Sequence, residues 1–170
     1  MPKIIESARR RLLQAAREQI AQNGYAKTTM RSMAAATDVA VGTVYNYFPS
    51  KDILIASFVS EDWHECVAAM ETCSVGDART LCEGIFNQLR AFSEKNRPLF
   101  SDPEAARIYN AAFSQRHKQL RQQLAWLIEP LCGDGDDRAF LASFIAEALL
   151  SWTREGEPFE NIYQIIQKLI

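Results

Sequence analysis

The sequence contains no apolar run long enough to cross a membrane. Its longest apolar stretch, residues 139–152, is shorter than the roughly 20 residues that a spanning helix needs, and Glu147 interrupts it. The first residues are rich in arginine and form no apolar run, so we expect no secretory signal. We therefore expect a cytoplasmic protein without a membrane partner, and its 48% hydrophobic composition predicts an ordinary hydrophobic core.

Motifs of catalytic and cofactor-binding sites are also missing. The chain has no glycine-rich phosphate loop, no nucleophile elbow and no HExxH segment, and its only histidines are His64 and His117. His64 has three acidic neighbours, Glu61, Asp62 and Glu65, but close neighbours on one helix point in different directions and cannot all converge on one ion. We therefore expect no enzyme activity, no cofactor and no metal site.

The four cysteines, Cys66, Cys73, Cys82 and Cys132, show no paired spacing of the kind that binds metals. Cys66 and Cys73 lie seven residues apart, too far along one helix for a disulfide. We expect buried thiols in a reducing compartment, and redox sensing through another pair remains an alternative.

Charge is distributed unevenly along the chain. Residues 1–51 carry eight Lys and Arg against three Asp and Glu, a net charge of +5, so the remaining residues carry −7 of the total of −2. A basic head on an acidic body is expected when only one end of a protein meets a polyanion. We expect most of Arg9, Arg10, Arg11 and Arg17 to be solvated, because they face several directions on a helix.

The segment 28–52 has the pattern of two short helices joined by a tight turn. Thr28 and Thr29 can cap a helix that starts near Met30. Asp38 tolerates a left-handed backbone and is therefore suited to the turn. The pattern predicts a helix-turn-helix.

The second of these helices covers residues 41–47. Val44 and Phe48 lie four residues apart and face inward. The opposite side presents Val41, Gly42, Tyr45 and Asn46. Glycine inside a helix costs about 1 kcal/mol relative to alanine, so Gly42 indicates close approach by a groove wall or by another helix of the chain.

Two cations occupy first turns of helices, where the helix dipole disfavours them. Arg31 follows the threonine cap, and Lys51 follows Ser50, which can cap the next helix because Pro49 ends the previous one. An anion between the cation and the helix N-terminus reverses the sign of the interaction, and DNA phosphates are such anions. A solvated surface position is the alternative for each.

These residues resemble the TetR family of bacterial transcription regulators, with Thr-Thr-Met-Arg at 28–31, Gly-Thr-Val-Tyr at 42–45 and Tyr-Phe-Pro-Ser-Lys at 47–51. The resemblance covers about residues 8–58. It implies DNA contacts at Thr29, Arg31, Val41, Gly42, Thr43, Tyr45, Tyr47 and Lys51. Asp38 and Ala40 replace the family's usual glycine and serine cap, so we expect a less rigid turn.

The rest of the chain has helical periodicity throughout. The predicted helices cover about residues 3–22, 51–73, 77–97, 102–131, 137–154 and 159–169. The fold class is therefore all-α. The family resemblance implies an N-terminal three-helix DNA-binding head joined by a long fourth helix to a helical ligand-binding and dimerisation body. We place the DNA-binding domain at residues 1–48 and the body at residues 49–170.

The last two predicted helices have more apolar surface than one chain of this size can cover. A homodimer with a four-helix interface explains this surface, and the family resemblance implies the same assembly. The expected interface residues are Phe140, Phe144, Ala148, Ile162, Ile165, Ile166 and Leu169. A single-chain core that ends on its last helix is the alternative.

Aromatic and sulfur side chains of the body could enclose an apolar cavity. The expected lining is Trp63, Cys66, Met70, Phe86, Phe92, Tyr109, Phe113 and Trp126. Ordinary core packing is the alternative for each residue. The family resemblance implies that a small, largely apolar effector binds there.

The sequence thus predicts a homodimeric regulator, a repressor that a small effector releases from an inverted-repeat DNA operator. The alternative is a helical protein-interaction module, or a redox- or metal-sensing module, without a diffusible organic ligand.

Overall fold

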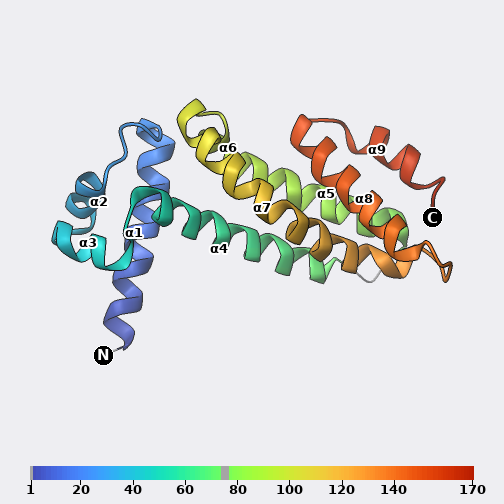
Figure 1. The fold of residues 1–170 in the computed structure, drawn as a ribbon, viewed down its shortest axis with the longest axis horizontal. Coiled ribbons are helices and arrows are strands. Elements are labelled where there is room, and N and C mark those ends of the chain that lie inside the picture. The colour runs from blue at the N-terminus through green and yellow to red at the C-terminus, as the bar shows by residue number, and fades with distance from the viewer. Residues whose placement is uncertain (1, 74–76) are drawn as a thin grey trace. The chain divides into compact units, whose positions relative to one another are not determined.

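The computed structural model of the chain describes the backbone of residues 2–73 and 77–170, and the side chains of residues 7–73, 77–106 and 117–170. The regular structure of this described part is helical and contains no β-strand (Figure 1), which confirms the all-α prediction. The chain divides into two compact units. The head unit comprises Met1–Asp62 and Asn96–Ala111, and the body unit comprises Trp63–Lys95 and Ala112–Ile170.

The head unit is built on a helix-turn-helix. Its helices are α1 (Pro2–Asn23), α2 (Met30–Thr37), α3 (Val41–Tyr47), the first part of α4 (Lys51–Thr72), α6 (Arg97–Phe100) and the start of α7 (Pro103–Ile128). Helix α1 packs against α2 and α6, and α2 packs against α3. Leu12, Met33, Val44 and Phe48 are buried in this core. The predicted starts at Met30 and Val41 are confirmed.

Short polar side chains begin the later helices as predicted. The Ser50 Oγ accepts a hydrogen bond from the Ile53 amide at 3.2 Å. Asp77 accepts one from the Thr80 amide at 2.8 Å. Asp102 likewise accepts hydrogen bonds from backbone amides in the first turn of α7. Each cap satisfies amides that have no partner within the helix.

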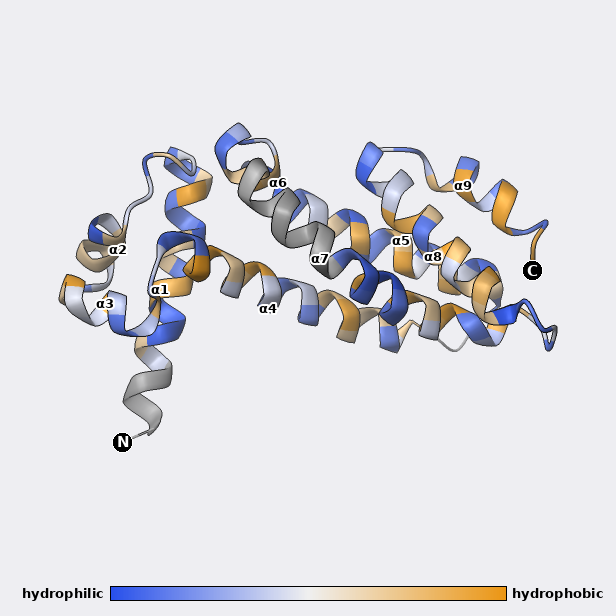
Figure 2. Ribbon diagram, in the orientation of Figure 1, coloured by the Kyte–Doolittle hydropathy of each residue, from blue (hydrophilic) through white to orange (hydrophobic). Residues whose placement is uncertain are grey.

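The body unit packs its remaining helices around one apolar core. They are α5 (Ala78–Lys95), η1 (Glu129–Leu131), α8 (Arg138–Glu155) and α9 (Phe159–Ile166), together with the second parts of α4 and α7. Helix α8 packs against α5, α9 and η1. Figure 2 shows hydrophobic residues along both α8 and α9. The fully buried side chains include Met70, Ile85, Leu124, Ile128 and Ile145.

Two segments differ from the sequence-based expectation. Residues 97–100 form the short helix α6, because Pro98 is tolerated in the first turn of a helix and does not prevent a new helix from starting. Helix α9 ends at Ile166 rather than at Leu169, since the Lys168 and Leu169 amides bond to carbonyls three residues earlier in tight turns. Among the described residues, no helix combines the length and the apolar character needed to span a bilayer.

Candidate nucleic-acid interface

Helix α2 begins with a reciprocal cap. Thr29 Oγ1 accepts a hydrogen bond from the Ser32 amide at 3.0 Å, and the Ser32 Oγ accepts one from the Thr29 amide at 2.9 Å. The Ser32 hydroxyl also donates to the Gln19 side chain of α1. These bonds fix the N-terminus of α2 on α1, and they hold Arg31 in the exposed first turn.

The turn between α2 and α3 contains the one residue other than glycine with positive φ in the described backbone. Asp38 has φ 53° and ψ 47°, which confirms the predicted left-handed conformation. The Val39 amide donates to the Ala34 carbonyl at 3.1 Å and thereby closes the turn. Ala40 occupies the N-cap of α3 and supplies no side-chain hydrogen bond, as expected where a serine is replaced.

Helix α3 has one buried side and one open side. Val44 and Phe48 are 0% and 2% exposed and attach the helix to the head unit. Val41, Gly42, Tyr45 and Asn46 are exposed, while Thr43 and Tyr47 are half-buried. The outward residues expected from the sequence therefore share one surface.

Gly42 lies on the open side of α3. A Cβ built at this position would meet no heavy atom within 4 Å. Close packing of Gly42 against another described helix of the chain is thereby excluded. The backbone of α3 is open at this point.

Lys51 makes two contacts with Tyr25, a residue that sequence reasoning had not singled out. The Lys51 Nζ donates to the Tyr25 carbonyl at 3.1 Å and lies 3.6 Å from the centroid of the Tyr25 ring. The Tyr25 hydroxyl donates to Asp52 at 2.5 Å. Burial and this hydrogen bond raise the pKa of Tyr25, so the phenol stays protonated and keeps the carboxylate of Asp52 as its partner. An ammonium has three N–H donors, so donors remain at Lys51 for a phosphate.

Two of the four arginines expected to be solvated are ion-paired inside the head unit. Arg9 bonds to Glu61 at 2.5 Å, and Arg17 bonds to Asp62 at 2.5 Å. The Asp62 side chain is 2% exposed. Both pairs join α1 to α4, which lie far apart in the sequence. Arg10 and Arg11 are exposed as expected, the paired Arg9 keeps 43% of its side chain exposed, and the paired Arg17 only 26%.

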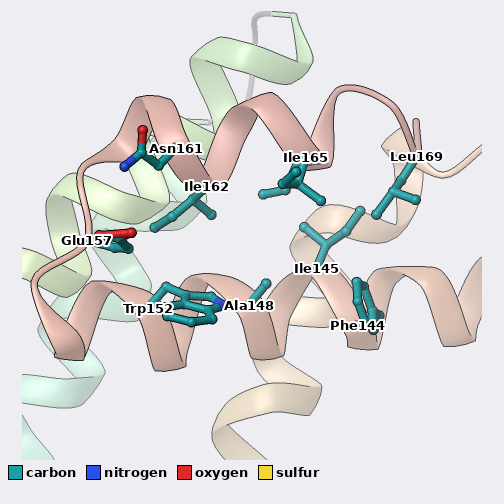
Figure 3. A pocket seen from close by; sticks show the side chains of 10 residues that line it. Phe144, Ile145, Ala148, Trp152, Glu157, Asn161, Ile162, Ile165 and Leu169 are labelled. Carbon is teal, nitrogen blue, oxygen red and sulfur yellow. The ribbon is translucent and has the colours of Figure 1, made fainter.

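The expected interface residues, except Phe140, line an apolar groove between α8 and α9. The groove has a volume of about 250 Å³ and is lined by Phe144, Ile145, Ala148, Trp152, Glu157, Asn161, Ile162, Ile165, Ile166 and Leu169. In Figure 3 the side chains of the two helices point toward one another across it. Ile162 and Ile166 are already buried within the chain, whereas Phe140, Phe144, Ile165 and Leu169 are 75%, 51%, 56% and 40% exposed.

The expected effector-pocket residues have different environments. Trp63, Cys66, Met70, Phe86 and Phe92 are buried. Trp63 packs edge-on against Phe92 with ring centroids 5.3 Å apart, and its Nε1 donates to Gln123 at 2.9 Å. Trp126 is 67% exposed, so it lies on the surface of the body unit rather than in its core.

Two further members of that set, Tyr109 and Phe113, lie outside the described side chains. They belong to α7 by backbone.

The buried thiols are poorly suited to redox chemistry. Burial raises the pKa of Cys66 to about 12, and burial together with the nearby Cys132 raises that of Cys82 to about 12. Burial also raises the pKa of Cys132. A thiol reacts as its thiolate, so these shifts disfavour reaction near neutral pH. No group of three or more potential metal ligands comes together within the described residues.

Sequence comparison finds relatives for part of the chain. Residues 12–58 match the family model of bacterial regulatory proteins of the tetR family. The HTH-type transcriptional repressor KstR of Mycobacterium tuberculosis is 37% identical over 70 residues, which are 41% of this chain and 32% of that repressor. The regulator UidR of Escherichia coli is 32% identical over 63 residues, 37% and 32% of the two chains. The chain thus spans about a third of the length of these relatives.

A longer match includes part of the body. The HTH-type transcriptional repressor Rv1474c of Mycobacterium tuberculosis is 31% identical over 114 residues, which are 63% of this chain and 61% of that repressor.

Solved structures of low sequence identity share the fold. The Thermus thermophilus repressor FadR, in complex with lauroyl-CoA, has a TM-score of 0.57 and 21% identity, covering 95% of this chain and 92% of that one. RolR, in complex with resorcinol, has a TM-score of 0.63 and 15% identity, covering 100% and 90%. The match at residues 12–58 coincides with the helix-turn-helix described above. Residues 12–58 of the chain therefore match the TetR family of bacterial regulatory proteins.

Proposed function

We propose that the chain is a sequence-specific DNA-binding transcription regulator that represses as a homodimer and leaves its operator when a small molecule binds. Residues 1–48, together with Lys51 at the start of α4, bind duplex DNA, and the rest of residues 49–170 binds the effector and forms the dimer. The names of the sequence relatives, transcriptional repressors and a transcriptional regulator, support this proposal.

The open side of α3 is the observation that carries DNA binding. A short helix that is anchored by Val44 and Phe48 presents exposed side chains around Gly42, where a built Cβ would meet no heavy atom of the described residues within 4 Å. An α-helix fits the major groove of B-DNA, and the second helix of a helix-turn-helix is the one that enters it.

Cations of the head unit provide contacts to the phosphates. Arg31 and Lys27 are exposed on the head unit, and Lys51 keeps free donors beside Tyr25. Arg9 and Arg17 are less available for this role because each is paired with a carboxylate of α4. Phosphate contacts of this kind position the protein on duplex DNA, while contacts to base edges select the sequence.

The exposed apolar residues of α8 and α9 support the homodimer. Phe144, Ile165 and Leu169 of the groove leave large apolar surfaces in solvent, and so does Phe140 of α8. A second copy related by a two-fold axis covers such a surface with the same surface of its own. The dimer then presents two heads, which requires an inverted repeat in the DNA.

The effector is proposed to be small and largely apolar. Two proteins of the same fold were solved with lauroyl-CoA and with resorcinol, and the expected pocket residues of this chain include buried aromatic and sulfur side chains. An effector releases the operator only if it prefers the conformation that does not bind DNA.

Selection from a pool of random duplexes tests the proposed function. The purified protein should enrich an inverted repeat, and its affinity for non-specific duplex should fall steeply with salt. The matched control is a variant with Arg31→Ala and Lys51→Ala, which should enrich the repeat far less. A protein that retains no duplex at low salt would instead be a helical interaction module.

A further inference from the structure

The outermost row of α3 consists of Gly42 and Asn46. Each lies two residues from the fully buried Val44, which is about 200° around a helix of 3.6 residues per turn. No other residues of α3 lie as far from its buried side. Asn46, which the family resemblance did not assign to DNA contact, is therefore the side chain that faces an approaching groove most directly.

The chemistry of this surface restricts the bases it can read. Residues 41–47, with the sequence VGTVYNY, contain no charged side chain and no glutamine. Arginine or lysine pairing with guanine and carboxylate pairing with cytosine are therefore unavailable from α3. The amide of Asn46 is the group on this helix that can form a bidentate pair, and its geometric match is the N6 and N7 edge of adenine.

The length of the Asn46 side chain supports the same assignment. Asparagine has a short side chain, so it contacts a base edge only where the helix backbone comes close to the groove floor. Gly42, one turn earlier in the same row, has no side chain, and the space around it is empty within 4 Å. The glycine thus permits the close approach that Asn46 requires.

Val41 and Tyr45 form the row beside Gly42 and Asn46. They lie four residues apart and are 36% and 50% exposed. In the major groove the one apolar group on a base edge is the C5 methyl of thymine. Two apolar surfaces in a row beside an amide therefore match consecutive A·T pairs.

We propose that Asn46 reads an adenine in each half-site and that Val41 and Tyr45 contact thymine methyl groups of neighbouring A·T pairs. This assignment rests on the proposed DNA-binding function and defines the class of sequence that α3 reads. The bases opposite Asn46, Val41 and Tyr45 are A·T pairs, and any bidentate reading of guanine in the half-site comes from outside α3.

Base analogues in the selected operator test the assignment atom by atom. Replacing adenines one at a time by 7-deazaadenine removes the N7 acceptor, and replacing thymines by uracil removes the methyl. For the wild-type protein, replacing one particular adenine of each half-site by 7-deazaadenine should weaken operator binding by on the order of 5- to 150-fold. The Asn46→Ala variant should bind the unmodified operator more weakly by the same factor. Replacing that adenine by 7-deazaadenine should not lower the affinity of this variant further.

The Val41→Ala variant should likewise bind the unmodified operator more weakly, and replacing one thymine by uracil should not lower its affinity further. Asn87→Ala changes an exposed asparagine of α5 in the body unit and should leave every analogue response unchanged. Since Asn46 is exposed, Asn46→Ala should melt at the wild-type temperature, and equal salt slopes would show that its phosphate contacts are intact.

The possible results distinguish the adenine assignment from the DNA-binding function on which it rests. An operator with G·C pairs opposite α3, or an Asn46→Ala variant with wild-type sensitivity to 7-deazaadenine, would overturn the adenine assignment and leave the regulator function standing. Failure to select any duplex would overturn the DNA-binding function itself.

Discussion

The ammonium of Lys51 lies 3.6 Å from the centroid of the Tyr25 ring and donates to the Tyr25 carbonyl at 3.1 Å. A lysine at the first turn of α4 is thereby held over an aromatic face before DNA arrives. A side chain that is already ordered loses less conformational entropy when it binds a phosphate. We regard Lys51 as a preorganised phosphate contact.

Lys51→Ala should weaken binding to all duplexes by a similar factor and should lower the salt slope by about one ion. Affinities measured at several salt concentrations, on operator and on random duplex, would show this. Tyr25→Phe is the matched control, because it retains the ring under Lys51 and removes only the hydroxyl that bonds to Asp52. A loss confined to one base position of the operator would contradict the phosphate role.

Two helical glycines should respond to alanine with opposite signs. Gly42→Ala adds a methyl group in open space, so it should stabilise the protein by up to about 1 kcal/mol and yet weaken operator binding. At Gly84 the new Cβ would lie 2.8 Å from the Cys73 Cβ, so Gly84→Ala should destabilise the body unit by about 1 to 3 kcal/mol. Chemical denaturation and operator titration of both variants test the pair, and unchanged DNA affinity of Gly42→Ala would remove the groove contact.

The buried ion pair of the head unit should contribute more to the free energy of unfolding than an exposed ion pair does. The Asp62 side chain is 2% exposed and accepts a hydrogen bond from Arg17, which also donates to the Phe58 carbonyl at 3.2 Å. Asp62→Ala leaves the partly buried Arg17 without its counterion and should cost about 3 kcal/mol of unfolding free energy.

Glu94→Ala is the matched control for Asp62→Ala. It breaks the pair with Arg90, in which both side chains are more than 60% exposed at 64% and 63%, and it should cost less than about 1 kcal/mol. Similar losses for the two variants in urea denaturation would contradict the stabilising role of the Arg17–Asp62 pair.

Local features of the head were predictable because neighbours in the sequence determine them. The left-handed turn at Asp38 and the caps at Thr29 and Ser50 each involve residues within four positions of one another. The Arg17–Asp62 and Lys51–Tyr25 contacts join residues 45 and 26 positions apart, and no pattern in the sequence indicates such partners.

Asn46 shows how the family resemblance limited the prediction. The helical period already placed it on the outer side of α3, but the carried-over DNA contacts omitted it. Trp126 illustrates a different limit. It was assigned to the pocket by residue type. The buried face of α7 is formed by residues such as Leu120, Leu124 and Ile128, and Trp126 lies outside this face.

The proposed dimer predicts a strong effect of charge beside the α8–α9 groove. Phe144→Glu and Ile165→Glu each place a carboxylate where the second copy would cover it, so each should weaken association by several kcal/mol. Light scattering across a dilution series would detect monomers at concentrations where the wild type is dimeric. Asn87→Glu, an exposed change on α5, is the control. Unaltered dimers for both groove variants would contradict this interface.

The last prediction concerns release by the effector. A ligand that prefers the conformation unable to bind DNA lowers operator affinity by its coupling free energy, which is typically about 1 to 3 kcal/mol or roughly 5- to 150-fold. Linkage requires that saturating operator weaken ligand binding by the same factor, since both changes close one thermodynamic cycle. A library of small apolar compounds should therefore yield a ligand that raises the melting temperature of the free protein. Titrating that ligand with and without operator duplex measures the coupling directly. Equal affinities in the two titrations would reject effector-driven release, even for a ligand that binds tightly.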